Sequence, residues 1–409
     1  MPAAHQSAYL DHAATTPMRP EAVEAMLPFL TVRYANPSGA HRMARDARRA
    51  LDEARDEWAE MLGCAPGEVV FTSGGTESDN LAVFGAARRP DDPAAELTAH
   101  AGLVVCSAIE HHAVLDPTLA LGGRTVAVDR TGRLDLDDLA AVLDQEARRH
   151  DAGEGPGVRL VSVMFANNET GAVQPVGEVA EVVRRHAPHA ALHTDAVQGF
   201  CLADLSVAAA AADLVSLSAH KFGGPKGVGL LVVRPSVRLT PRQLGGGQER
   251  GHRPGTQDVA GIVAATVAGR LTAASRPAEV ERLTKLRDRL VEGLLAVLDD
   301  AVETGVERVD GLADRSGRAP GIAHLCLGGV ESEALLYLLE QAEVFASAAS
   351  SCSSGAMEAS HVLGAMGVPS EWAAGSLRLS LGWASTDAEV DHALAAIPPA
   401  VHQLRRFTL

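Results

Sequence analysis

Short apolar runs alternate with helical stretches between Glu68 and Val233. Each run is apolar along most of its length, a pattern typical of strands that are buried on both faces of a parallel sheet. We therefore expect an α/β fold whose large domain holds a mostly parallel, seven-stranded sheet covered by helices. Ligands of such sheets bind beyond the carboxyl ends of the strands. The runs are Glu68–Thr72, Leu103–Ser107, Thr125–Val128, Arg159–Phe165, Ala190–Thr194, Asp213–Ser218 and Val228–Val233.

The pattern changes after Thr256. Two helical stretches are expected there, Val259–Ala274 and Pro277–Leu298, and leucines at helical spacing in the second indicate core packing. Short strands and further helices follow at Ile322–Leu327, Ser332–Gln341, Ser376–Leu381 and Asp387–Leu404. We predict a large domain over residues 16–262 and a smaller α/β domain formed by residues 1–15 and 263–409.

Composition narrows the class of protein. The chain has 409 residues, 46% of them hydrophobic and 3% aromatic, so its core is expected to consist of alanine, valine and leucine. The formal net charge of −16 argues against a general nucleic-acid binder and against a protein that binds anionic membranes. No apolar run has the length of a membrane span, and the first residues lack the features of a signal peptide, so we expect a cytoplasmic location.

Lys221 follows the expected strand Asp213–Ser218 and precedes a glycine turn. A lysine at a strand end, with hydroxyl and histidine side chains just before it, suits attachment of pyridoxal 5′-phosphate. The aldehyde of that cofactor forms a Schiff base with an amine, and its phosphate needs N–H and hydroxyl donors. Most lysines are solvated surface charges, so this motif alone leaves both interpretations open.

A second segment could hold the phosphate. The strand expected at Glu68–Thr72 leads into Ser73-Gly74-Gly75-Thr76, and Thr76 and Asp79 have the spacing of a helix-capping pair. Two glycines at this position let bare N–H groups approach an anion at the positive end of the helix. The alternative is an ordinary capped turn between a strand and a helix.

Polar residues also follow the strand expected at Ala190–Thr194. A carboxylate at Asp195 could keep a pyridine nitrogen protonated, which makes the ring an electron sink, and Gln198 could reach the ring hydroxyl. The structural alternative is that Asp195 caps a helix. That alternative is weakened by Lys221, which lies at the end of another expected strand.

His111 and Asn168 occupy comparable positions after two other strands. An imidazole there could stack on the cofactor ring and carry a proton near neutral pH. Asn168 could bind a substrate carboxylate or the ring oxygen. A loop histidine is usually solvated, however, and the segment 167–171 could be an ordinary turn.

Two further segments could bind anions. The glycine-rich segment Gly245–Thr256 resembles a flexible linker, yet its arginines and its terminal threonine suit an anion site. Arg378 lies in an otherwise apolar strand, where its guanidinium requires a carboxylate partner. A substrate carboxylate and an internal salt bridge satisfy that requirement equally well.

Cys352 lies within a run of eleven small residues, 346–356, which can form little core and indicate an exposed loop. The other four cysteines are expected to be inert, buried thiols, and no C-x-x-C pair is present, so neither a disulfide framework nor a metal site is indicated. Cys352 is therefore the candidate for a reactive thiol. The other cysteines are Cys64, Cys106, Cys201 and Cys326.

Taken in chain order, these segments resemble the cysteine desulfurases of the class V aminotransferase family, which are pyridoxal-phosphate enzymes of fold type I. The resemblance covers nearly the whole chain. The matching segments are Tyr9–Pro17, Asn36–Ser38, Phe71–Asn80, Glu110–Val114, Asn167–Gly171, His193–Gln198, Ser218–Gly229, Gly245–Thr256 and Leu377–Gly382.

The resemblance implies a role for each candidate residue. Lys221, His111 and Cys352 would be catalytic, with Cys352 carrying a persulfide as in the group with the longer cysteine loop. Arg378 and Asn168 would orient the substrate carboxylate, and no metal is implied. The implied cofactor-binding residues are Gly75, Thr76, His111, Asn168, Asp195, Gln198, Ser218, His220, Lys221 and Thr256, the last from the neighbouring subunit of a homodimer.

The function implied by the resemblance is removal of sulfur from L-cysteine, giving L-alanine and a persulfide that passes to an iron–sulfur scaffold or a tRNA-thiolation protein. The cysteine loop departs from the usual Gly-Ser-Ala-Cys-Thr-Ser, and Ala359 replaces a common proline, which leaves the preferred acceptor open. Competing interpretations are a selenocysteine lyase, an aminotransferase and a non-catalytic sulfur carrier. The combination of Lys221, Asp195, His111 and Cys352 favours the desulfurase.

Overall fold

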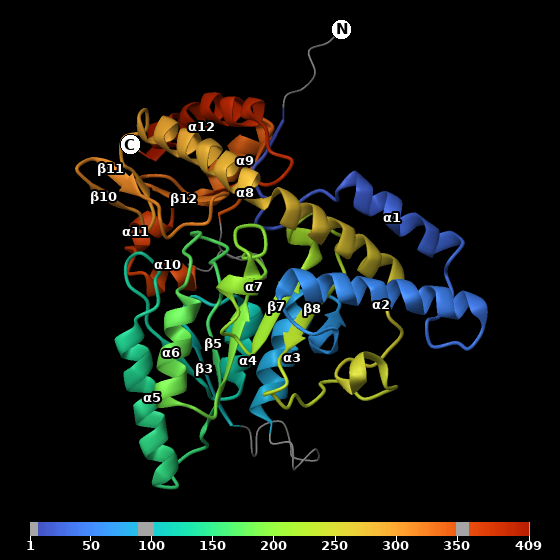
Figure 1. The fold of residues 1–409 in the computed structure, drawn as a ribbon. Helices are drawn as coiled ribbons and strands as arrows, with labels where there is room; N and C mark the ends of the chain where they lie inside the picture. The colour runs from blue at the N-terminus through green and yellow to red at the C-terminus, as the bar shows by residue number, and fades with distance from the viewer. Residues whose placement is uncertain (1–6, 89–101, 349–359, 409) are drawn as a thin grey trace.

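A seven-stranded sheet forms the centre of the larger part of the molecule in the computed structural model, which describes residues 7–88, 102–348 and 360–408 (Figure 1). The strand order is β2-β8-β7-β6-β5-β3-β4. Strand β8 runs antiparallel to both neighbours, whereas the other neighbouring strands are parallel, so the predicted mostly parallel sheet is confirmed. The strands are β2 (Val69–Thr72), β3 (Leu103–Ser107), β4 (Arg124–Val126), β5 (Val158–Ser162), β6 (Ala191–Asp195), β7 (Leu214–Ser218) and β8 (Gly229–Val233).

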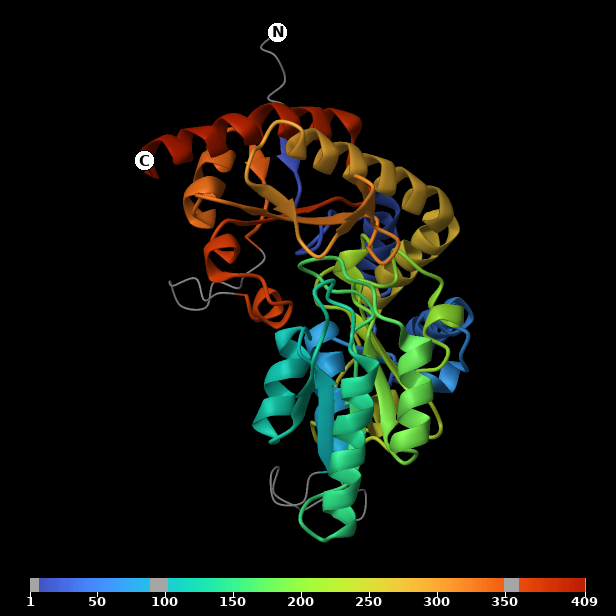
Figure 2. The ribbon, with the colours of Figure 1, turned by 90° about the vertical axis from the view of Figure 1, so that its left-hand side faces the viewer.

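Helices cover both faces of this sheet (Figures 1 and 2). The core on one face includes Trp58 from α2, Leu139 from α5 and Ile262 from α8 (Val259–Leu295). On the opposite face, Leu81 from α3 and Val114 from α4 pack against the strands. The helices of this part are α1 (Pro20–Thr31), α2 (Arg42–Leu62), α3 (Gly75–Ala87), α4 (His112–Ala120), α5 (Leu136–Asp151), α6 (Val176–His186) and α7 (Leu205–Ala208).

A smaller α/β part lies above the first in both views. Its antiparallel sheet has the order β14-β12-β9, and the strand at the N-terminal end, β1, pairs in parallel with β13. The strands are β1 (Ala8–Tyr9), β9 (Ala301–Glu303), β10 (Glu307–Val309), β11 (Leu312–Asp314), β12 (Ile322–Leu327), β13 (Val344–Phe345) and β14 (Ser376–Ser380). The helices are α9 (Ser332–Gln341), α10 (His361–Ala365), α11 (Ser370–Ala373) and α12 (Asp387–Thr408).

The expectation of two separate helices between residues 259 and 298 is wrong. A single helix, α8 (Val259–Leu295), runs through Pro277. Pro277 is exposed, so the carbonyl that loses its helical N–H partner can be hydrated instead. Packing holds the helix on both sides of the proline: its first half lies in the core beneath the large sheet, and its second half lies in the core of the smaller part. The predicted division into a large domain, 16–262, and a small domain, 1–15 with 263–409, stays a prediction. Helix α8 runs across the limit between residues 262 and 263.

None of the helices in the described part of the chain combines the length and the apolar character that crossing a bilayer requires.

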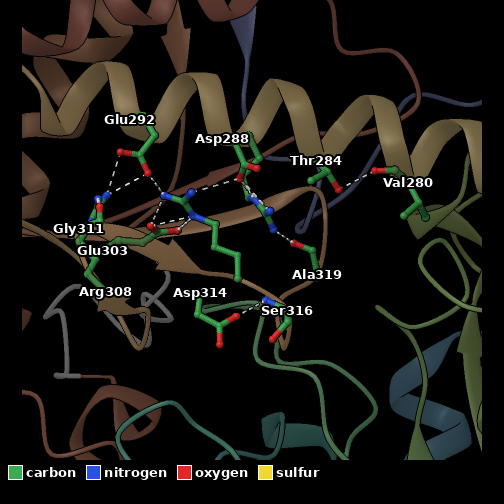
Figure 3. Close-up of polar contacts among 12 residues, drawn as sticks. Val280, Thr284, Asp288, Glu292, Glu303, Arg308, Gly311, Asp314, Ser316 and Ala319 are labelled. Carbon is green, nitrogen blue, oxygen red and sulfur yellow. Dashed lines mark hydrogen bonds and ion pairs between the residues drawn. The ribbon is translucent and has the colours of Figure 1, made fainter.

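A buried ion-pair network fixes the outer edge of the smaller part (Figure 3). The guanidinium of Arg315 lies 2.6 Å from a carboxylate oxygen of Glu303 and 2.6 Å from one of Glu292, and it also faces Asp288. The side chains of Arg315 and Glu303 are only 9% and 6% exposed. Glu292 also pairs with Arg308 of the β10–β11 hairpin, so the network ties the hairpin and β9 to helix α8.

We expect Glu303→Gln to lower the free energy of unfolding by about 3 kcal/mol, because it leaves the buried Arg315 cation without its most buried counter-charge. Urea unfolding followed by circular dichroism measures the change. Glu281→Gln is the matched control, since the Glu281–Lys285 pair on the same helix is largely exposed and should leave stability unchanged. Equal losses in the two variants would contradict a special role for the buried network.

Candidate active site

A cavity of about 370 Å³ opens beyond the carboxyl ends of the parallel strands. The structure brings ten of the predicted site residues to its walls. Thr256 is exposed and is not among the lining residues, and Cys352 lies outside the described residues. The ten lining residues are Gly75, Thr76, His111, Asn168, Asp195, Gln198, Ser218, His220, Lys221 and Arg378.

Lys221 ends the short 3₁₀ helix η2 (Ala219–Lys221), which follows β7 directly. Its Nζ donates to the carbonyl oxygens of Ala13 at 2.5 Å and Ala14 at 2.8 Å. Burial lowers the pKa of the amine to about 8, and the positive charge of Arg378 acts in the same direction. Near neutral pH, an appreciable fraction of this lysine is therefore an uncharged nucleophile.

The N-terminus of α3 forms one wall of the cavity. Helix α3 starts at Gly75, with Gly74 as its N-cap, so the predicted capping pair of Thr76 and Asp79 is wrong. Glu77 accepts from the N–H of Ser73 instead, and Asp79 turns into the interior with 1% of its surface exposed. A side chain at position 75 would place its Cβ 2.8 Å from the Val197 side chain, so the close approach of backbone there depends on glycine.

Ser218 and His220 complete this end of the cavity. Ser218 ends β7 and is buried, whereas His220 binds Thr15 through Nδ1 at 3.1 Å. Burial lowers the pKa of His220 to about 4, so its imidazole is neutral at physiological pH. The open N–H groups of a 13-residue helix, two hydroxyls and a neutral imidazole form a donor set suited to a phosphate.

Asp195 ends β6 and is 5% exposed. Its Oδ1 accepts from the N–H of Val197 at 2.9 Å within a turn, and no helix begins there, so the alternative that Asp195 caps a helix is wrong. Burial raises the pKa of Asp195, whereas the neighbouring His111 and Lys221 lower it. The carboxyl therefore lies in a desolvated position that requires a positive partner to stay ionised.

His111 caps α4, and its Nδ1 accepts from the N–H of Ala113 at 3.1 Å. Desolvation lowers the pKa of the imidazole, although the negative charge of Asp195 opposes this change. Gln198 donates from Nε2 to the Ala13 carbonyl oxygen at 2.9 Å, the same oxygen that Lys221 contacts. The His111 and Gln198 side chains thus reach the cavity from different walls.

Arg378 reaches the cavity from β14 of the smaller part. Its guanidinium lies 2.6 Å from Asp11 and also donates to the main-chain carbonyl of Asn168, so the internal salt bridge considered from the sequence is present. The Arg378 Nε, however, is buried and has no hydrogen-bond partner among the described residues. One donor of the guanidinium is therefore available for a further acceptor.

Sequence reasoning missed a buried polar layer beneath Asp195. It contains Asp79, His193 and Ser216, together with Ser162 and Glu110, all with 1% or less of their surface exposed. The period of two in the segment His193-Thr194-Asp195 and the segment Ser216-Leu217-Ser218 was the available signal, because alternate residues of a strand share one face. Polar residues at alternate positions of a strand predicted to be fully buried indicate such a layer.

The four described cysteines behave as inert thiols. Burial raises the pKa of Cys64 and of Cys201 to about 11, and it also raises the pKa values of Cys106 and Cys326. The raised pKa values agree with the expectation of inert thiols, whereas burial is confirmed for Cys106 and Cys326 only, because Cys64 and Cys201 are half-buried.

The sequence model described as Aminotransferase class-V matches residues 8–393. The chain is 43% identical to an IscS-like cysteine desulfurase of Mycobacterium tuberculosis over 407 residues, which cover 98% of each protein. It is 42% identical to a cysteine desulfurase of Cereibacter sphaeroides, over 98% of this chain and 97% of that protein. The chain belongs to the class-V aminotransferase family. The predicted family is confirmed.

Solved structures agree with this family. A NifS-like protein superposes with a TM-score of 0.84 at 32% identity, over 97% of this chain and 100% of the other. The structure titled DndA from Streptomyces lividans gives a TM-score of 0.70 at 34% identity, over 91% and 99%. SspA in complex with cysteine gives 0.74 at 29%, over 93% and 100%.

Members of this family depend on pyridoxal 5′-phosphate, and the residues of the cavity fit it. The glycine-lined N-terminus of α3 with Thr76, Ser218 and His220 would hold the phosphate. The amine of Lys221, with its lowered pKa, would bind the aldehyde carbon, and Asp195 would face the ring nitrogen.

The rate at which the apoprotein attaches pyridoxal 5′-phosphate should rise with pH, with a midpoint near pH 8, because only the neutral Lys221 amine attacks the aldehyde. Stopped-flow absorbance near ~420 nm measures this rate. Arg378→Met should move the midpoint to higher pH by removing a neighbouring positive charge, and Lys221→Ala should show no attachment. A midpoint near ~10.4, the ordinary lysine value, would contradict the burial argument.

Proposed function

We propose that this protein is a pyridoxal-phosphate-dependent cysteine desulfurase that converts L-cysteine to L-alanine and keeps the sulfur as a persulfide on Cys352. The observation that carries the proposal is the single cavity in which Lys221, Asp195 and His111 meet Arg378. The relatives named cysteine desulfurase support the activity, and the neighbour solved in complex with cysteine supports the substrate.

The reaction balances without an external oxidant or reductant. The carbon–sulfur bond of L-cysteine breaks, and a sulfur–sulfur bond to the enzyme thiol forms. The hydrogens of the two thiols are redistributed, so that one ends on the methyl group of alanine and the other on the persulfide. Lys221 is suited to move the substrate α-proton, because burial already favours its neutral form.

Bound pyridoxal 5′-phosphate supplies an electron sink that stabilises negative charge at the substrate α-carbon. Asp195 supports that property as long as it remains ionised beside the ring nitrogen. His111, whose lowered pKa favours a neutral imidazole, can accept a proton from a thiol in the cavity. His111 is the N-cap residue of α4, and this position makes it the proposed proton carrier between the substrate and the enzyme thiol.

Arg378 and Asn168 would orient the substrate carboxylate. The unpaired Nε of Arg378 provides a donor directed from a buried, positively charged group, and such charge-assisted bonds are stronger than neutral ones. Asp11 already neutralises part of the guanidinium charge, so the carboxylate would share this arginine with Asp11. The proposed arrangement places substrate between the two parts of the molecule.

Cys352→Ala should retain the absorbance of the bound cofactor and lose persulfide formation, because the other thiols lack thiolate character near neutral pH. The measurements are alanine release in a single turnover and mass spectrometry of alkylated persulfide. Cys64→Ala is the matched control and should behave as the wild type. Alanine formation by Cys352→Ala at the wild-type rate would disprove the assignment of the nucleophile.

The proposal includes a homodimer in which Thr256 completes the cofactor site of the neighbouring subunit. Thr256 is exposed and does not line the cavity of its own chain. Helix α1 packs against the start of α8 through Phe29 and Val259, and it exposes Leu27 and Leu30 by more than half. Tyr34, which follows the helix, is also exposed by more than half. Thr256 precedes Val259 by three residues, and these apolar side chains offer a suitable surface for a second copy of the chain.

Complementation tests the composite site. Thr256→Ala and Ser218→Ala chains should each bind pyridoxal 5′-phosphate about tenfold more weakly as homodimers, since each loses one hydrogen bond to a charged group. A heterodimer purified through two different tags should regain one tight site, built from the intact Ser218 of one chain and the intact Thr256 of the other. Calorimetric titration counts the tight sites. A heterodimer with no tight site would refute the shared arrangement.

The persulfide would be passed to an acceptor protein, either an iron–sulfur scaffold or a tRNA-thiolation protein. Relatives named IscS support such a transfer without deciding between the two acceptors. A reactive thiol at Cys352 must remain reduced between turnovers, a condition that the cytoplasm maintains, so a cytoplasmic location is part of the proposal. L-cysteine, rather than a nucleic acid or a membrane, is the proposed ligand of the cavity.

A further inference from the structure

Four polar side chains lie on one face of three adjacent strands beneath the cavity. His193 and Asp195 are two residues apart on β6, so they share a face. Ser162 of β5 is the register partner of His193, and Ser216 of β7 is the register partner of Asp195. Because neighbouring residues of parallel strands point to the same side, all four side chains lie on the face covered by α3.

Hydrogen bonds join three of these side chains, those of Ser162, His193 and Ser216. The Nδ1 atom of His193 lies 2.8 Å from the Ser162 hydroxyl, and its Nε2 lies 2.9 Å from the Ser216 hydroxyl. His193 has no exposed surface, and burial lowers its pKa to about 3. The imidazole is therefore neutral, so it offers one donor and one acceptor and no positive charge.

Asp79, a residue of helix α3, lies next to these hydrogen-bonded side chains. Its Oδ1 lies 3.6 Å from Nε2 of His193, and this oxygen is buried without a hydrogen-bond partner in the described part of the chain. Burial raises the pKa of Asp79 well above its ordinary value, and the negative charge of Asp195 acts in the same direction. Only a hydrogen bond from Ser216 opposes these effects.

A third buried carboxyl, that of Glu110, interacts electrostatically with Asp79 and Asp195. It accepts from the N–H of Met164 at 2.6 Å through one oxygen, and its other oxygen is buried and unpaired among the described residues. Burial and the charge of Asp195 raise the pKa of Glu110 as well. Three buried carboxyls this close cannot all be ionised.

The groups around each carboxyl determine which of the three is ionised. Asp195 is the carboxyl whose pKa is lowered by its basic neighbours, His111 and Lys221, and by the N–H of Val197. Asp79 faces Asp195 and Glu110, which are acidic, and His193, which is neutral. Among the described residues, the groups that shift the pKa of Asp79 include no cationic side chain.

We propose that Asp79 is a positioning residue for Asp195: as a neutral acid beside His193 and Ser216, it keeps Asp195 as the one carboxylate that faces the cofactor ring nitrogen. The inference rests on the proposed function, because it concerns the bound cofactor. Asp79 is among the residues that line the cavity, with 1% of its surface exposed, and its proposed effect on the cofactor is exerted through Asp195. Its neutral carboxyl supplies polarity that a desolvated carboxylate next to it requires.

The test is the ¹⁵N chemical shift of pyridoxal 5′-phosphate labelled at the ring nitrogen and bound to the protein, measured by solid-state NMR between pH 6 and pH 10. Wild type and Asp79→Asn should both give the protonated ring-nitrogen signal near neutral pH, because asparagine reproduces a neutral polar group of the same shape. Asp79→Leu should shift the signal toward the unprotonated form and weaken cofactor binding about tenfold, the change that corresponds to one pKa unit.

The alkaline limb gives a second readout that remains informative if Asp79→Leu does not fold. As pH rises, the wild-type Asp79 should ionise and add a negative charge beside Asp195, so the ring-nitrogen signal should show a transition that Asp79→Asn lacks. Glu110→Gln is the matched control: it removes the other neutral carboxyl and should keep the Asp79 transition. Circular dichroism checks the fold of each variant.

The possible outcomes distinguish failure of the proposed function from failure of the proposed role of Asp79. A wild-type protein that binds no pyridoxal 5′-phosphate would overturn the proposed function. With the cofactor bound, a neutral-pH signal in Asp79→Asn that differs from wild type would show Asp79 to be ionised and would overturn the inference. Equal behaviour of Asp79→Leu and wild type, or the same alkaline transition in wild type and Asp79→Asn, would overturn it as well.

Discussion

An ionised carboxylate at Asp195, almost fully removed from water, is the constraint on which the rest of the site depends. Burial opposes its charge, the basic side chains of His111 and Lys221 lower its pKa, and Asp79 and Glu110 add only further carboxyls. The same burial keeps Lys221 partly neutral. One desolvated cavity thus prepares an acid and an amine for opposite tasks, each by disfavouring its charged form.

The parallel sheet makes that arrangement possible. Five neighbouring strands end at one edge, so residues that follow β3, β5, β6 and β7 meet there although they are far apart in the chain. The register places Ser216 opposite Asp195 and Ser162 opposite His193, which turns isolated polar positions into one hydrogen-bonded layer. Helix α3 covers that layer, and its N-terminus faces the cavity.

Much of this could be predicted from the sequence, and the failures have specific causes. Strand β3 has the predicted bounds, because continuous apolar runs identify buried strands well. The two helices expected at Val259–Ala274 and Pro277–Leu298 are one helix, because packing on both sides carries α8 through Pro277. The spacing of Thr76 and Asp79 predicts a capping pair, but spacing alone does not reveal that α3 begins at Gly75 and that the Asp79 carboxyl is directed inward. The roles of the site residues stay predictions.

The segment that contains Cys352 lies outside the described residues, yet both of its ends are fixed at the cavity. Before it, Ser347 forms a backbone pair with Arg378, and the carbonyl of Ala348 accepts from the Ser376 hydroxyl. After it, Ser360 donates to the buried Glu169 at 2.5 Å, and His361 contacts the main-chain oxygen of Glu110 at 2.9 Å. One end is therefore attached to the strand that carries Arg378, and the other to the turn that carries Asn168 and the residue before His111.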